Sequence, residues 1–72
     1  MKFSVSPDKK LYEDGNLDWS DLDFLKPYGF ELSGYSMYSL PPQKELFLDR
    51  PLPPSTLNSL FDMIRERGFN VR

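Results

Sequence analysis

The chain has 72 residues, nine Lys and Arg against eleven Asp and Glu, a formal net charge of −2 and no cysteine. This length predicts one small domain, residues 1–72, near the lower limit for a self-sufficient core. The absence of cysteine excludes a disulfide framework, a thiol nucleophile and thiolate metal ligation. The N-terminus has no apolar run of signal-peptide length, and no stretch approaches a membrane span. We therefore expect a soluble, cytoplasmic protein without a membrane partner.

The N-terminal residues predict a short strand followed by a returning strand. Residues 2–6 alternate apolar and polar side chains, which is typical of a strand. The turn-forming residues at 6–9 allow residues 10–13 to return as the partner. A second hairpin, closed by the Asp-Gly pair at 14–15, competes for the same residues. The two hairpins remain alternatives, with the first slightly favoured.

A short helix is predicted at about residues 20–26. Ser20 has a good N-cap side chain, and aspartates in the first turn suit the helix dipole. Pro27 disfavours helical geometry at the residue before it. We therefore expect this helix to end by residue 26.

A central strand pair is predicted from residues 28–40 and 44–49. One set of alternating side chains is assigned to the core: Phe30, Leu32, Leu46 and Leu48. Gly34 interrupts the first run and marks either a bulge or a turn that splits it in two.

The longer helix is predicted at about residues 55–67. Ser55 is its expected N-cap, and the prolines at 53–54 are expected to precede its start. Its apolar stripe follows helical spacing: Leu57, Leu60, Phe61 and Ile64. Gly68 can close the helix in the left-handed conformation, and residues 69–72 can add a terminal strand. A helix of this length is marginal alone, so it must dock on the sheet.

Together these elements predict an α+β fold: a small antiparallel sheet with both helices packed on one face. The order is compatible with a reduced ferredoxin-like βαββαβ arrangement, and a simpler meander with helices is the alternative.

Apolar side chains left over from the core predict a contact surface. By parity, Tyr35, Met37 and Phe47 lie on the opposite face of the sheet, where a contiguous apolar patch marks an interaction site. An acidic segment supplies a second, electrostatic contact: Asp14, Asp18, Asp21 and Asp23. These features favour a non-enzymatic protein-interaction module that acts by occupying a surface, as an inhibitor, adaptor or small subunit. The partner is another protein, and a homodimer through the patch is one form of this hypothesis.

A single-stranded nucleic-acid-binding domain is the alternative. Sheet aromatics can stack bases while cations contact phosphates. The candidates are Tyr35, Tyr38 and Phe47 for stacking and Lys44, Arg50, Arg65 and Arg67 for phosphate. The negative net charge disfavours it. Without histidine or a Gly-rich phosphate loop, the sequence predicts no catalytic residues, cofactor or metal.

Overall fold

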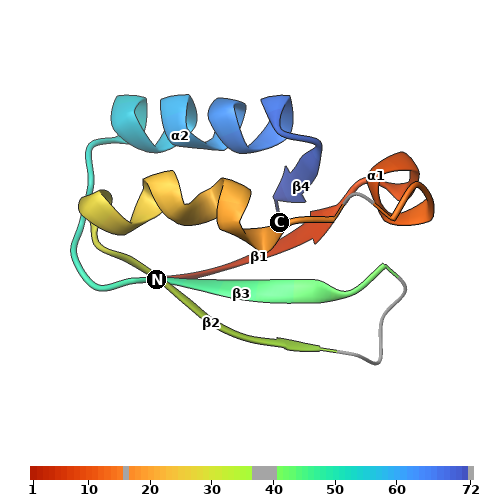
Figure 1. Ribbon diagram of the computed structural model, residues 1–72. Coiled ribbons are helices and arrows are strands. Elements are labelled where there is room, and N and C mark those ends of the chain that lie inside the picture. The colour runs from red at the N-terminus through yellow and green to blue at the C-terminus, as the bar shows by residue number, and fades with distance from the viewer. Residues whose placement is uncertain (16, 37–40, 72) are drawn as a thin grey trace.

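A computed structural model describes residues 1–15, 17–36 and 41–71 and contains one sheet with its helices stacked on one side (Figure 1). The elements are β1 (Lys2–Pro7), α1 (Lys9–Glu13), the 3-10 helix η1 (Trp19–Tyr28), β2 (Phe30–Ser36), β3 (Gln43–Leu48), α2 (Pro54–Glu66) and β4 (Phe69–Val71).

The sheet has four strands in the order β2-β3-β1-β4, and neighbouring strands are antiparallel. The chain passes through α1 and η1 between β1 and β2, and through α2 between β3 and β4. Because β1 pairs with β3 and β4 rather than with β2, the sheet is not a meander. The topology is the split βαβ arrangement of ferredoxin-like folds, built here from short elements. The predicted α+β class is confirmed.

The segment after β1 is helical, so the prediction of a strand at 10–13 is wrong. The Asp8 carboxylate caps α1 by accepting a hydrogen bond from the Leu11 N–H at 2.8 Å. The Asp8 N–H donates to the Gly68 carbonyl at 2.8 Å, which fixes this turn beside the end of α2. Neither predicted hairpin forms, because residues 9–13 are in α1 and Gly15 lies in the turn after it, with φ +70°.

The predicted helix at 20–26 is the ten-residue 3-10 helix η1. Its N-cap is Asp18 rather than Ser20, and it continues through Pro27 to Tyr28. Pro27 lies near the end of the element, so its missing N–H costs a single i→i+3 bond. The helix instead ends at Gly29, whose φ of +96° favours glycine. A Cβ added at this position would also lie 2.6 Å from an oxygen of Asp49.

The apolar face and the end predicted for the longer helix are confirmed, whereas its predicted start is wrong. α2 begins at Pro54, and its N-cap residue Pro53 makes no side-chain capping bond. Proline is favoured in the first helical turn because its missing N–H would have no partner there. Gly68, at φ +88°, follows the helix and turns the chain into β4.

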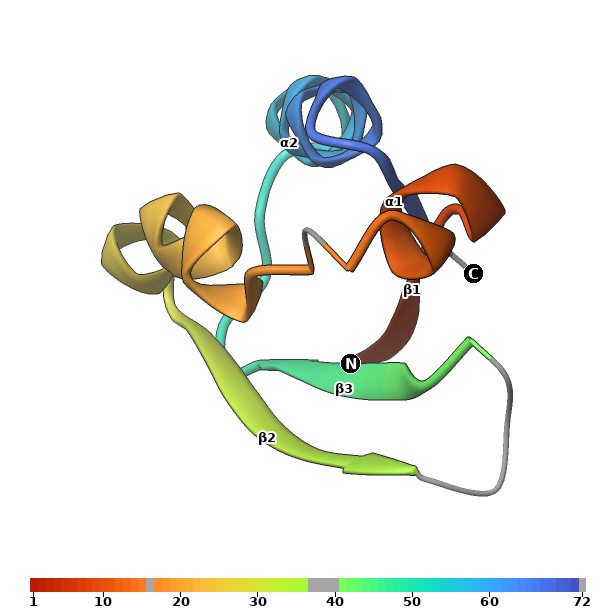
Figure 2. The same ribbon diagram turned by 45° about the vertical axis from the view of Figure 1, so that its right-hand side comes forward.

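The core lies between the sheet and the helices, and its buried apolar residues come from every element except α1: Val5, Leu22, Leu25, Phe30, Leu46, Leu48, Leu60, Ile64 and Phe69. Phe3 joins the two layers at its edge, because its ring centre is 5.1 Å from that of Phe61 on α2 and 6.1 Å from that of Phe30 on β2. Seen from the second direction, α1, η1 and α2 all lie on this one side of the sheet (Figure 2).

Candidate interaction surface

The face of the sheet away from the helices has no described element packed on it (Figure 2). A row of paired residues crosses this face from β1 through β3 to β2. Phe47 on β3 lies between Lys2 and Glu31, its Cα partners on the two neighbouring strands. The next row of the same face contains Ser4 and Glu45. We call the set Lys2, Ser4, Glu31, Glu45 and Phe47 the open face.

Phe47 is the aromatic centre of the open face. Its strand is an inner strand of the sheet, yet the residue is 38% exposed. The neighbouring residues of the same strand, Leu46 and Leu48, are buried against the helices. The alternation of exposed and buried residues over 45–48 thus assigns Phe47 to the outer side, as the sequence predicts.

The residue of β2 that pairs with Phe47 is Glu31, and the pairing of Tyr35 follows a different register. The register shifts between Ser33 and Tyr35, so Gly34 is an extra residue within a continuous β2 and not a turn that splits the strand. Beyond this shift, the Cα partner of Tyr35 is Lys44, which in turn is the Cα partner of Val5 on β1. Tyr35 thus lies beyond the register that joins Phe47 to Glu31, and its place on the face of Phe47 stays a prediction. Met37 lies outside the described residues.

The acidic residues belong to the helical layer. Asp14 is the C-cap of α1 and Asp18 is the N-cap of η1, while Asp21 and Asp23 lie within η1. All four are exposed, and Asp23 forms an ion pair with Lys26 at 3.4 Å. Because this layer covers the opposite side of the sheet, the structure does not bring the acidic residues together with Phe47.

Asp18 has a defined local role. Its carboxylate accepts hydrogen bonds from the Ser20 hydroxyl at 2.6 Å and from the Ser20 N–H at 3.0 Å. The hydroxyl bond, followed by the backbone bond, lowers the pKa of Asp18. A carboxylate that stays charged at the start of η1 suits the dipole there, so Asp18 has a structural function independent of any partner.

The cations proposed for phosphate contact are dispersed. Lys44 Nζ lies 5.3 Å from the ring centre of Trp19, and the Arg67 guanidinium lies 4.2 Å from the ring centre of Phe24. Arg50 and Arg65 each form an ion pair with an aspartate, at 3.1 and 3.2 Å respectively. None of the four is a member of the open face. Tyr38, the remaining stacking candidate, lies outside the described residues.

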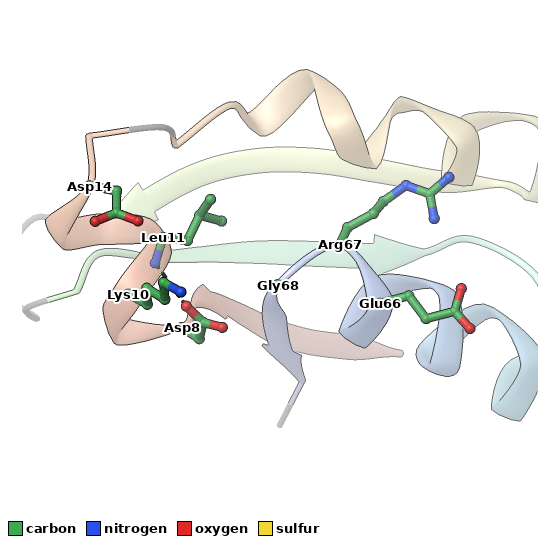
Figure 3. A pocket seen from close by; sticks show the side chains of 7 residues that line it. All are labelled: Asp8, Lys10, Leu11, Asp14, Glu66, Arg67 and Gly68. Atoms are coloured by element: carbon green, nitrogen blue, oxygen red, sulfur yellow. Dashed lines mark hydrogen bonds between the residues drawn. The ribbon is translucent and has the colours of Figure 1, made fainter.

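A cleft between α1 and the end of α2 is a feature that the sequence analysis missed. It has a volume of about 280 Å³ and is lined by Asp8, Lys10, Leu11, Asp14, Glu66, Arg67 and Gly68. Figure 3 shows the side chains of Glu66 and Arg67 directed away from α1. The charged groups therefore do not converge as those of a ligand site do. Asp8, a residue type favoured at N-caps, was the sequence signal for α1 and hence for this cleft.

Within residues 1–15, 17–36 and 41–71, no group of three or more potential ligand side chains is placed to hold a metal ion. None of the described helices combines the length and the apolar character needed to cross a membrane. Comparison of the chain with protein families, curated proteins and solved structures finds no match.

Proposed function

We propose that this protein is a non-enzymatic protein-interaction module that works in the cytoplasm by occupying the surface of another protein with its open face. The observation that carries the proposal is the exposure of Phe47 at the middle of a sheet face without a helical cover. An aromatic ring flanked by charged side chains has the composition of an interface anchor with a polar rim.

The acidic residues of the helical layer have a separate part in this proposal. They point to a different side of the molecule from Phe47, so they do not share its contact. Their charge attracts basic surfaces that approach the helical layer, which is a contact separate from that of the open face. Nucleic-acid binding is less well supported, because the open face contains one cation, Lys2, against two carboxylates.

Photo-crosslinking in the cell of origin tests the proposal. The photoreactive analogue p-benzoylphenylalanine replaces Phe47 in one variant and, as a control, Tyr28 in another. Tyr28 is similarly exposed, at 41%, but lies at the end of η1 in the helical layer. We expect light-dependent protein adducts at position 47 and a much weaker yield at position 28.

The adducts are identified by mass spectrometry after separate protease and nuclease treatment. Equal yields at the two positions, or no adduct at position 47, would contradict the proposed function. An adduct at position 47 that nuclease removes would favour the nucleic-acid alternative.

A further inference from the structure

We infer that the open face binds a second copy of the same chain, and that a two-fold axis parallel to β3 relates the two sheets. This inference depends on the proposed function, because it names the protein that occupies the face. It follows from the order of charges in the row that contains Phe47.

The row is self-complementary. Lys2 and Glu31 have opposite charges and lie on either side of Phe47. Adjacent strands are about 4.8 Å apart, so the two charges are separated across the sheet by roughly 10 Å. Both residues are exposed, and neither takes part in an ion pair within the part of the chain that the structure describes. Each charge is thus available to a group outside the protomer.

A two-fold axis along β3 exchanges the two sides of the row. Lys2 of one protomer then faces Glu31 of the other, twice in the dimer, and the two Phe47 rings meet on the axis. Packed sheets lie about 10 Å apart, a gap that one aromatic side chain from each sheet can fill. A two-fold axis across the strands would instead oppose Lys2 to Lys2 and Glu31 to Glu31. The charges therefore select the first arrangement.

The edges of the sheet are poorer sites for a second copy. The edge strand β2 contains the register shift at Gly34, which interrupts the regular pattern that an added strand needs. The other edge strand, β4, has three residues. Association through the face avoids both restrictions.

Two features limit the strength of this dimer. The open face measures roughly 20 Å by 15 Å from strand rise and spacing, so about 600 Å² is buried in total, well below a standard stable interface. In addition, Glu45 of one protomer faces Glu45 of the other near the axis, two residues along β3 from Phe47. These two like charges repel each other. We therefore expect a weak, reversible dimer that forms at high protein concentration.

Charge reversal tests the pairing. Sedimentation equilibrium compares the wild type with Lys2→Glu and Glu31→Lys, at concentrations up to about 1 mM because the interface is small. Each reversal alone should weaken the dimer about tenfold or more, since symmetry makes every altered pair count twice. An equimolar mixture of the two variants should associate about as well as the wild type, because both cross-pairs are again opposite in charge.

The matched controls are Lys10→Glu on α1 and Glu66→Lys on α2, which alter net charge equally but lie in the helical layer. They should weaken the dimer less than twofold. A monomeric wild type, a mixture without recovery, or controls as disruptive as the open-face variants would each overturn the inference.

The adduct at position 47 separates the two proposals. A foreign protein there, with a monomeric wild type, overturns the dimer and supports the proposed function, whereas no adduct overturns the proposed function itself.

Discussion

The substitution Leu60→Ala is expected to leave the domain largely unfolded at room temperature. Leu60 is 2% exposed and lies on the face of α2 that packs on the sheet. Removing such a side chain costs about 2–5 kcal/mol through lost burial and the cavity left behind. A core of this size seldom supplies more than about 3–5 kcal/mol of net stability. Far-ultraviolet circular dichroism during urea unfolding measures the loss.

Met63→Ala is the matched control for Leu60→Ala. Met63 lies on the same helix but is 38% exposed, so its truncation should change the free energy of unfolding by less than about 1 kcal/mol. If Leu60→Ala unfolds at the same urea concentration as the wild type, α2 does not pack on the sheet through this face.

Phe69→Ala is expected to destabilise the domain by about 3–5 kcal/mol. Phe69 is 1% exposed and belongs to β4, where it pairs with Pro7 of β1. Its ring centre is 5.5 Å from that of Trp19, the single tryptophan of the chain. Loss of this ring removes packing between β4 and η1, so tryptophan fluorescence during chemical unfolding follows the effect at the altered contact.

The control for Phe69→Ala is the same replacement at Phe47. Because Phe47 lies on the open face, its truncation should cost less than about 1 kcal/mol and leave the fold intact. Equal destabilisation by the two substitutions would place Phe47 in the core and remove the proposed contact surface.

The parts of the fold that the sequence predicted are those with a regular hydrophobic period. The stripe through Leu60 and Ile64 identifies α2, and the alternation of Leu46 and Leu48 identifies β3 together with its inner face. Gly68 marks the end of α2 because the left-handed conformation there favours glycine. Such patterns repeat over several residues, so they remain recognisable when one side chain departs from them.

Short segments were predicted less well, because a contact distant in sequence determines them. Residues 9–13 are too few to show a helical or a strand period, and their helix is fixed by the cap at Asp8 and the bond from Asp8 to Gly68. Pro27 was expected to end the second helix at residue 26. The 3-10 geometry of η1 tolerates proline near its end, so the stop falls at Gly29 instead.

The candidate site was likewise predicted correctly where the pattern is regular and missed where it is not. The alternation of apolar side chains around Phe47 is regular, so it correctly predicts the outward position of this residue. Parity could not be carried past Gly34, because the register with β3 shifts between Ser33 and Tyr35. The charge row was also beyond sequence reasoning, since pairing Lys2 with Phe47 requires the register between β1 and β3.

A dilution series followed by ¹⁵N–¹H NMR spectroscopy tests most directly the central claim, that the open face binds a second copy of the chain. As concentration rises, the amide signals of Lys2, Glu31 and Phe47 should shift together along one binding curve, while those of α2 stay in place. Shifts concentrated in α2 or α1, or an open face that does not respond to concentration, would contradict it.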